Sequence, residues 1–452
     1  HGLRVKVLEP AHERLGPQTD YSYTLDIWAG SPVGMITANS VYGALYGLET
    51  FSQLLRGDRS VAASEVAVVD APQYAWRGLL IDSGRRFVPV PLVKNLLDTM
   101  AAVKLNVLHL HASDHCRWGV ESKVYPQLTA ALKGDMAGFY TQADIKELVS
   151  YAKHRGIRVV PEFDIPGHAR GLIPLEDEGI KFCTTTEDRS QLYNDPGNST
   201  LKVLKELMRE MAGLFEDDVF NIGCDETTVV GSCDKEGTFR LEREMVNTIQ
   251  KSYGKTPEGW EEVLFTEDAA TATTIVDGWS RHNASSITST GRRAVESSAT
   301  HFYFTSPAPG GPKGWSACHH DIGAGLAAGE RPRLLGGEMS MWTDRYCLTL
   351  QCGAFHGKAP DGAPLFPPSA DDAFSKSMGG MIWPRGFVAA GSFWNFDPSL
   401  DPASKEFEEK IWELNDRLAA RGSLVCPSRC SCDVVSACGK PYLHGLEKEI
   451  YT

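Results

Sequence analysis

Two adjacent carboxylates, Asp225 and Glu226, follow a short apolar run, Val-Phe-Asn-Ile-Gly-Cys, that begins at residue 219. A run of this length and composition predicts a buried strand with the two acids at its carboxyl end. Because neighbouring carboxylates repel each other's charge, one can keep its proton near neutral pH while the other stays ionised. Such a pair could donate a proton and orient a substrate, whereas a lone acidic pair could equally be a solvated strand end.

Polar and aromatic residues follow other apolar runs in the same way. In chain order they are Asp82 and Arg85; His109, His111 and Asp114; Glu162, Asp164 and His168; Trp260 and Glu261; Trp279; and Glu338, Trp342 and Asp344. Each residue alone could be a satisfied core side chain. Because the carboxyl ends of parallel strands meet at one face of a barrel, their convergence there predicts an active site.

The elements that would position these residues form a repeating pattern from Trp76 onward. Strands are predicted at 78–82, 105–111, 157–164, 219–225, 274–279, 294–298 and 334–341, and helices open near Pro91 or span 142–155 and 199–215. About eight strand–helix units over roughly 320 residues favour an α/β fold of the closed (β/α)8 TIM barrel type. No Gly-x-Gly-x-x-Gly turn follows the first strand, so dinucleotide binding is not expected.

A small α+β domain is predicted ahead of the barrel. Residues 1–75 form this zincin-like N-terminal domain, incomplete at its start, and residues 76–452 form the barrel with a C-terminal helix and a cysteine-rich tail. Alternating apolar residues over 21–28 predict a strand, and residues 40–55 have helical spacing with Ser40 as the cap.

The composition excludes several classes of protein. Hydrophobic residues make up 42% of the 452 residues and charged residues 23%, which is ordinary for a globular protein. No apolar run approaches the roughly 20 residues that cross a bilayer, so no membrane span is predicted. The net charge of −13 disfavours nucleic acid and favours a neutral or cationic ligand.

Cysteines and glycosylation sequons indicate export through an oxidising compartment, with a secreted or lysosomal or vacuolar destination. The chain has eleven cysteines, and sequons start at Asn198 and Asn283. The four cysteines of the tail lack zinc-site spacing, so disulfides are favoured there. Candidate pairs are Cys183 with Cys233 and Cys426 with Cys438. The chain begins at His1 without a signal peptide, and we interpret it as a processed or trimmed chain.

The residue types at the strand ends indicate a sugar pocket. Trp260, Trp279 and Trp342 can pack on the CH faces of a pyranose, while Arg85 and the acids satisfy its hydroxyls. An ordinary retaining glycosidase holds its two carboxylates about 5 Å apart across the scissile bond, and an inverting one holds them farther apart. Consecutive acids at one strand end cannot easily flank a bond, but they can serve a substrate that carries its own nucleophile.

Several motifs stand in a fixed order along nearly the whole chain. They are ITAN at 36–39, GLETFSQ at 47–53, RGLLIDSGR at 77–85, KLNVLHLH at 104–111, PEFDIPGH at 161–168, GCDE at 223–226, GWEE at 259–262 and GGEMSMW at 336–342. In these motifs the chain resembles the family-twenty glycoside hydrolases, the β-N-acetylhexosaminidases. The resemblance implies hydrolysis of terminal non-reducing N-acetylglucosamine or N-acetylgalactosamine residues with retention of configuration.

The resemblance also implies a substrate-assisted mechanism. The 2-acetamido oxygen of the substrate attacks the anomeric carbon and forms an oxazolinium intermediate. Asp225 then holds the acetamido group and balances its charge, while Glu226 protonates the leaving oxygen and later activates water. Asp164 and His168 are implied as a supporting pair behind Glu226.

Further residues match the sugar-binding positions of the family. Arg85 is implied to bind the outer hydroxyls, Asp114 to lie near the pocket, Trp260, Trp279 and Trp342 to wall it, and Tyr303 to bind the acetamido group. The chain departs from the family pattern at Leu110, Cys224, Thr305 and Asp344, the last standing where a glutamate usually reads the 4-hydroxyl. The preference between gluco and galacto configurations is therefore open.

Two functions from other classes are alternatives. His109 and His111 would lie on one face of a strand, as metal ligands do in barrel hydrolases, but no matching ligand set follows, so no metal or cofactor is predicted. A catalytically silent glycan-binding homologue is the other alternative, although a binding site has no use for a general acid. The predicted partner is an oligosaccharide or glycoconjugate, and the resemblance suggests a homodimer. Residues 347–368 are predicted to form a long loop on the active-site side.

Overall fold

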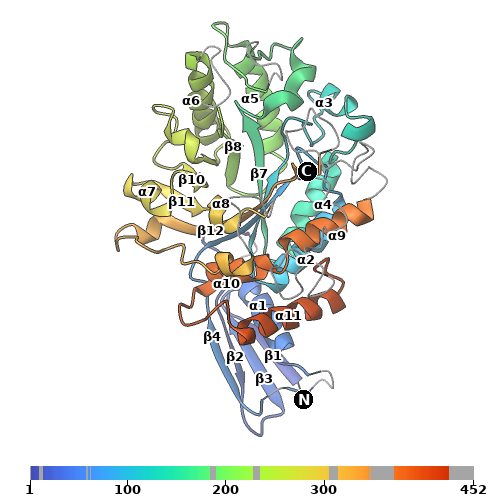
Figure 1. Cartoon of the computed structure of the whole chain (residues 1–452), viewed down its shortest axis with the longest axis vertical. Helices are drawn as coiled ribbons and strands as arrows, with labels where there is room; N and C mark the ends of the chain where they lie inside the picture. The colour runs from blue at the N-terminus through green and yellow to red at the C-terminus, as the bar shows by residue number, and fades with distance from the viewer. Residues whose placement is uncertain are drawn as a thin grey trace.

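A computed structural model of the chain describes residues 2–9, 14–56, 60–61, 63–183, 190–227, 235–304, 314–344, 346–347 and 371–426. A small sheet lies at one end of the molecule and a barrel with its surrounding helices forms the rest (Figure 1). Among the described residues, no helix combines the length and apolar character needed to cross a bilayer.

The small sheet is four-stranded and carries one helix. Its strands are β1 (Gly2–Val7), β2 (Tyr23–Ile27), β3 (Val33–Ala38) and β4 (Val66–Asp70), in the order β1-β3-β2-β4. Helix α1 (Val41–Gln53) packs on β2 and β3, and the Ser40 side chain accepts a hydrogen bond from the Gly43 amide at its start. The strand predicted at 21–28 and the Ser40-capped helix are confirmed.

A cation joins the small sheet to the barrel. Lys104, in the turn before the second barrel strand, donates from Nζ to Asp70 Oδ2 at 2.8 Å. The same ammonium lies 4.5 Å from the ring centre of Trp394, whose indole nitrogen donates to Asp70 Oδ1 at 2.8 Å. Because Trp394 belongs to helix α10 (Arg385–Asn395), the sheet, the barrel and the C-terminal helices meet at one ion pair.

Eight parallel strands close the barrel, which confirms the predicted fold class. They are β5 (Trp76–Asp82), β6 (Val107–His111), β7 (Arg158–Ile165), β8 (Val219–Gly223), β9 (Thr256–Trp260), β10 (Ile275–Gly278), β11 (Arg293–Glu296) and β12 (Leu334–Met341). The apolar pattern does not delimit β9, because Pro257 and Gly259 are residues that usually interrupt strands. Trp260 nevertheless lies at the strand end where it is expected.

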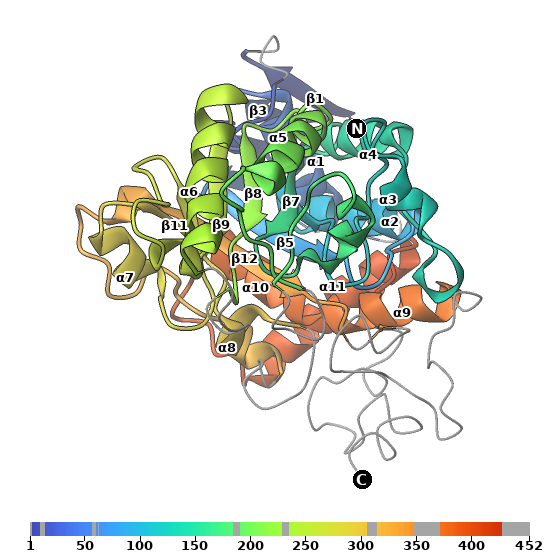
Figure 2. The same ribbon diagram turned by 90° about the horizontal axis from the view of Figure 1, so that it is seen from above.

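The helices surround the barrel, as the view from above shows (Figure 2). They are α2 (Val90–Ala102), α3 (Gln127–Ala130), α4 (Gln142–Lys153), α5 (Ser199–Ala212), α6 (Lys235–Ser252), α7 (Ala284–Ser289), α8 (Ala299–Phe302), α9 (Asp371–Ile382), α10 and α11 (Lys405–Ala420). The helices predicted near Pro91, at 142–155 and at 199–215 correspond to α2, α4 and α5. Thr141 and Asp144 form a reciprocal capping box at the start of α4, which explains why that boundary is readable from the sequence.

Polar side chains fill the upper half of the barrel. His109 Nδ1 is 2.7 Å from Glu338 Oε1, and its Nε2 is 3.2 Å from Glu162 Oε2. Burial raises the pKa of Glu258 to about 8 and the pKa of Asp277 well above its usual range, so these acids are neutral where two buried anions would repel each other. Because both nitrogens of His109 contact carboxylates inside the barrel, this side chain does not face the mouth as a metal ligand would.

Candidate active site

Asp225 and Glu226 lie just beyond the end of β8, where the sequence predicts them. The backbone there is unusual, because Gly223, Cys224 and Glu226 have φ values of 71°, 72° and 54°. This left-handed conformation is uncommon for residues other than glycine and turns the chain sharply away from the strand. As a result the two side chains differ in exposure, with 14% of the Asp225 side chain and 46% of the Glu226 side chain open to solvent.

A bulge on the neighbouring strand brings a third acid against the pair. Glu162 pairs with Asn221, but Ile165 rather than Asp164 pairs with Gly223, so β7 carries one extra residue there. The extra residue turns the Asp164 carboxyl toward β8. A Cβ atom on Gly223 would lie 1.8 Å from Asp164 Oδ1, so only glycine permits this approach.

The histidine of the next loop joins the two strand ends. His168 Nε2 lies 3.2 Å from Glu226 Oε2 and 3.4 Å from Asp225 Oδ2, and its Nδ1 lies 3.5 Å from Asp114 Oδ1. The resemblance implies that Asp164 and His168 both stand behind Glu226. The structure places His168 at both acids, whereas Asp164 stands behind Asp225, because the bulge on β7 directs it there.

The buried acids Asp164 and Asp225 differ in protonation state. Burial and the nearby Asp225 carboxylate hold the pKa of Asp164 well above its usual range, so Asp164 keeps a proton. Burial alone would raise the pKa of Asp225, but the positive His168, whose Nε2 lies 3.4 Å from Asp225 Oδ2, lowers it, so Asp225 is an anion. The neighbouring carboxyls with opposite protonation states are therefore Asp164 and Asp225, where the sequence suggests Asp225 and Glu226.

Arg85 organises a second group of acids at the barrel mouth. Its guanidinium lies 3.1 Å from Asp82 Oδ2, 3.1 Å from Asp114 Oδ2 and 3.2 Å from Asp344 Oδ1. Burial opposes its charge, but these carboxylates hold the pKa of Arg85 well above its usual value. The guanidinium carbon also lies 5.2 Å from the ring centre of Trp342, so the cation stands beside an aromatic face.

Four aromatic side chains form one wall beside the acids. Trp260 and Trp342 are buried with ring centres 5.7 Å apart, and Tyr303 lies 6.0 Å from Trp342. Trp279 stacks on Tyr303 with an interplanar angle of 7°. All four residues are predicted from the sequence as pocket residues, and the structure brings them together in a single cluster.

Two acids hold this wall, and of these only Glu261 is among the residues that the sequence places at a strand end. Glu262 accepts a hydrogen bond from the Trp279 indole at 3.1 Å, and burial together with Asp225 raises the pKa of Glu262 to about 8. Glu261 accepts hydrogen bonds from four consecutive backbone amides that begin at Trp279. The GWEE motif contains both residues, but only the fold shows that they fix the loop after β10.

A buried glutamate on α6 anchors the residue that follows Glu226. Glu242 accepts a hydrogen bond from the Thr227 hydroxyl at 3.2 Å and another from Thr266. Burial raises the pKa of Glu242 from 4.5 to about 7. Between these values the folded protein holds a proton that the unfolded chain has lost, so the free energy of unfolding falls as the pH rises through this window.

We expect Glu242→Gln to raise the free energy of unfolding at pH 8 by as much as about 3 kcal/mol, because the amide keeps the shape without the buried charge. Below about pH 4.5 the Glu242 carboxyl is neutral in the unfolded chain as well as in the folded protein. The gain in the free energy of unfolding should then disappear. Thermal melts of both proteins across this pH range measure the effect. The control is Glu244→Gln, an exposed change on the same helix, which should shift no melt; an equal gain at every pH would contradict the explanation.

Parts of the predicted site lie outside the described residues. These are Thr305, residues 348–368 of the predicted loop, Cys233 and Cys438. Cys116, Cys183 and Cys426 are disulfide-bonded, and the pairings suggested for the last two stay predictions.

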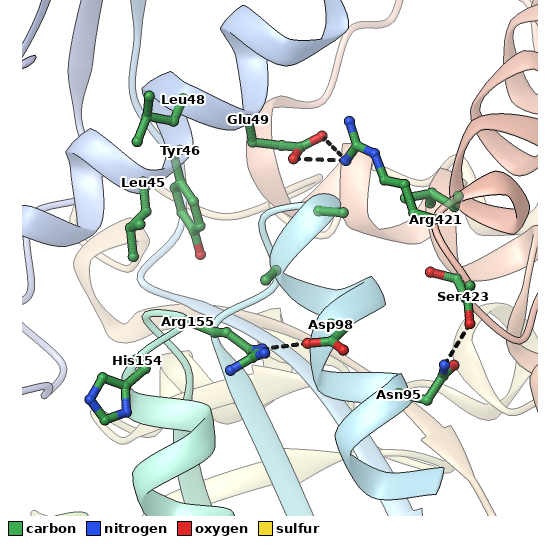
Figure 3. Close-up of a pocket in the computed structure, with 14 residues that line it drawn as sticks. Leu45, Tyr46, Leu48, Glu49, Asn95, Asp98, His154, Arg155, Arg421 and Ser423 are labelled. Atoms are coloured by element: carbon green, nitrogen blue, oxygen red, sulfur yellow. Dashed lines mark hydrogen bonds and ion pairs between the residues drawn. The ribbon is translucent and has the colours of Figure 1, made fainter. Parts of the chain in front are cut away.

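A separate cavity of about 410 Å³ lies between α1, α2 and the end of α11 (Figure 3). Two ion pairs stand at it, Glu49 with Arg421 and Asp98 with Arg155. None of the predicted site residues lines this cavity, so it is distinct from the barrel mouth.

The fold and the site together define a (β/α)8 barrel protein of the glycoside hydrolase type, with acids and a wall of aromatic residues at the strand ends. The model for the glycosyl hydrolase family 20 catalytic domain matches residues 74–346, and a beta-acetyl hexosaminidase-like model matches residues 2–54. The chain belongs to glycosyl hydrolase family 20.

Known proteins show the same relationship. Beta-hexosaminidase subunit A2 of Dictyostelium discoideum is 35% identical over 55% of this chain and 49% of its own length. A Beta-hexosaminidase of Emericella nidulans is 29% identical over 91% of this chain and 76% of its own. The human Beta-hexosaminidase subunit beta is 35% identical, but only 38% of its length is matched. The chain thus spans half or less of two of these three relatives.

Solved structures agree with the architecture. A chitobiase of Flavobacterium johnsoniae superposes with a TM-score of 0.72 at 28% identity, covering 93% of this chain and 63% of that one. The GH20 beta-N-acetylhexosaminidase of Streptomyces coelicolor superposes with the same TM-score at 23% identity, covering 95% of this chain and 86% of that one. The second likeness bears on the fold alone.

Proposed function

We propose that this protein is a β-N-acetylhexosaminidase that removes terminal non-reducing N-acetylglucosamine or N-acetylgalactosamine residues with retention, through an oxazolinium intermediate. The observation that carries the proposal is the charge arrangement at the end of β8. Asp225 is an anion beside the positive His168 and the neutral Asp164, and Glu226 stands next to it with its side chain open to solvent. Family membership supports the same chemistry.

The proposal gives a separate task to each group. The Asp225 carboxylate can accept the amide N–H of a 2-acetamido group, which makes the amide oxygen a better nucleophile and offsets the charge of the oxazolinium. Glu226 can protonate the leaving oxygen and then deprotonate the incoming water. The wall of Trp260, Trp279, Tyr303 and Trp342 is suited to the CH face and methyl group of the sugar.

A pair of chromogenic substrates tests this proposal. A β-N-acetylglucosaminide should be cleaved readily, whereas the matched β-glucoside lacks the acetamido nucleophile and should be cleaved at least about a thousandfold more slowly. A thiazoline that mimics the oxazolinium should inhibit competitively. Comparable rates on the two substrates, or no inhibition, would remove the substrate-assisted step.

The same assay separates the alternatives. A catalytically silent glycan-binding protein would bind the thiazoline but release no chromophore. A metal-dependent hydrolase would lose its activity after treatment with a chelator, and we expect full activity to remain. The contacts of His111 also disfavour a catalytic metal at this residue, because carboxylates contact both of its ring nitrogens. One nitrogen lies 2.6 Å from Glu162 Oε2 and the other 2.9 Å from Asp114 Oδ2.

We further propose that Asp344 makes the enzyme tolerant of the configuration at C4. The Asp344 carboxylate lies 3.2 Å from Arg85 Nε, so its short side chain is held by the arginine at the barrel mouth. The gluco and galacto rates of the wild type should then lie within about tenfold of each other. Asp344→Glu should extend the carboxylate toward the sugar and widen the ratio by about tenfold or more, which is the effect of one charged hydrogen bond.

Paired kcat/KM values on the gluco- and galacto-configured chromogenic substrates measure this ratio. Asp344→Asn serves as the control, because it keeps the length and removes the charge, and it should lower both rates together. A ratio that is the same in Asp344→Glu as in the wild type would show that another residue reads the 4-hydroxyl.

We also infer an exported protein, secreted or lysosomal. Asn198 and Asn283, which start the two sequons, are exposed at the beginnings of α5 and α7, where an oligosaccharide would have room. The bonded state of Cys116, Cys183 and Cys426 also fits an oxidising compartment. Glycosidase digestion of the natural protein tests the first point. The resemblance predicts a homodimer, which light scattering of the purified chain tests.

A further inference from the structure

The barrel mouth holds a cluster of potential metal ligands beside the catalytic acids. Asp114 and His115 belong to the loop after β6, and His168 belongs to the loop after β7. One ligand-type atom from each lies within 4.8 Å of the other two. Asp114 Oδ1 is 3.5 Å from His168 Nδ1 and 3.9 Å from His115 Nε2. The family resemblance gives His115 no role.

These separations are close to those around a bound metal ion. Two ligands with bonds of about 2.0 Å stand about 3.3 Å apart across a tetrahedral angle. The two separations from Asp114 therefore need to close by about 0.2 Å and about 0.6 Å, and the separation between the two imidazoles needs to close from a value within 4.8 Å. The His115 side chain is 18% exposed, so an ion can reach it from solvent, and its ring lies edge-on to the His168 ring with centres 4.9 Å apart.

We propose that Asp114, His115 and His168 form an inhibitory site for a divalent late transition-metal ion, zinc above all. Two imidazoles and one carboxylate are a ligand set that zinc, copper and nickel prefer. Magnesium and calcium prefer ligand sets made of oxygen alone, so they should not bind here. Water would complete the coordination of the ion.

The residues around Asp114 orient its carboxylate for the ion, but they also weaken the binding of the ion. His111 Nε2, at 2.9 Å, and Arg85, at 3.1 Å, both contact Asp114 Oδ2, and Oδ1 accepts a hydrogen bond from the His115 backbone amide, so the carboxylate is fixed with Oδ1 toward the two imidazoles. Arg85 also lies 3.4 Å from His168 Nδ1, and its charge opposes a cation there. The ion must also replace a proton on His168, because only a neutral imidazole coordinates a metal. We therefore expect weak, reversible binding.

Binding at this site would affect catalysis through His168. Its Nδ1 would hold the ion, while its Nε2 is the nitrogen that contacts Asp225 and Glu226. A ring drawn toward the ion would leave both acids, and the ion would compete with Arg85 for Asp114. The resulting inhibition rests on the proposed hexosaminidase function, whereas the binding itself does not.

Isothermal titration of the full chain with zinc chloride tests the binding. The wild type should bind one zinc ion, His115→Ala should bind it at least about tenfold more weakly, and His115→Asp should recover part of the affinity through its carboxylate. His154→Ala removes a histidine at the end of α4, away from the cluster, and should bind like the wild type. Magnesium chloride should give no binding heat.

Zinc inhibition of chromogenic substrate cleavage tests the consequence, with each variant compared to its own metal-free rate. His115→Ala should need at least about tenfold more zinc for half inhibition than the wild type and His154→Ala. Equal zinc affinity in wild type and His115→Ala, or no binding, would overturn the site. Binding that depends on His115 without inhibition would overturn the inhibitory role. A protein that cleaves no hexosaminide would refute the proposed function, and the titration would still decide the metal site.

Discussion

The loss of activity in Glu226→Gln should be largest for substrates whose leaving group has a high pKa. With an oligosaccharide or alkyl leaving group we expect kcat/KM to fall by about a thousandfold or more, because the amide cannot donate the proton that the departing oxygen requires. With a strongly activated aryl leaving group the loss of the first step should be far smaller. Rates on a series of aryl glycosides of decreasing leaving-group pKa measure this dependence.

Two controls make this result specific. Azide can attack the oxazolinium without a general base, so it should restore turnover of the activated substrates by Glu226→Gln. Glu413→Gln, an exposed change on α11, should leave every rate unchanged. A loss that is the same for all leaving groups would show that Glu226 is not the proton donor.

Asp225→Asn should cost about a hundredfold to a thousandfold in kcat, because the anion that stabilises the oxazolinium is replaced by a neutral amide. Asp164→Asn should cost much less, about tenfold or below, since the neutral amide matches the neutral carboxyl that burial and Asp225 impose on Asp164. The two changes are chemically identical, so their difference reports which of the two carboxyls carries the charge. Steady-state kinetics on the N-acetylglucosaminide measure both.

Asp164→Ala completes this comparison. It removes the neutral polar group that Asp164→Asn keeps beside Asp225, so the kcat of Asp164→Ala should fall further than that of the asparagine variant. Similar losses for Asp164→Asn and Asp225→Asn would mean that both acids are ionised. In that case the division of charge between β7 and β8 would be wrong.

The sequence predicts the barrel well because its signals are local. Short apolar runs separated by helical spacing mark seven of the eight strands, and the capping residue Ser40 marks the start of one helix. Strand β9 is not delimited by its composition. Helix α10 is also missed, because it is buried on nearly every side and shows no polar face. The strand-end rule then places the site residues on one face of the barrel.

The part of the site that the sequence could not give depends on pairing between strands. Nothing local shows that β7 carries a bulge, yet that single extra residue moves Asp164 from Glu226 to Asp225. The roles of Glu242 and Glu262 are hidden for a similar reason, because each acts on a partner at least fifteen residues away in the chain. Protonation states follow from such neighbours and from burial, which a single sequence does not reveal.

Adjacent positions in the left-handed turn at the two acids differ in which substitutions they tolerate. Each non-glycine residue in that conformation costs about 1–2 kcal/mol, so Cys224 and Glu226 make this loop a weak point that the surrounding barrel must outweigh. Laboratory evolution for heat resistance should therefore sample Cys224→Gly early, since glycine releases that energy. Gly223 should stay fixed in every surviving clone, because any side chain there collides with Asp164.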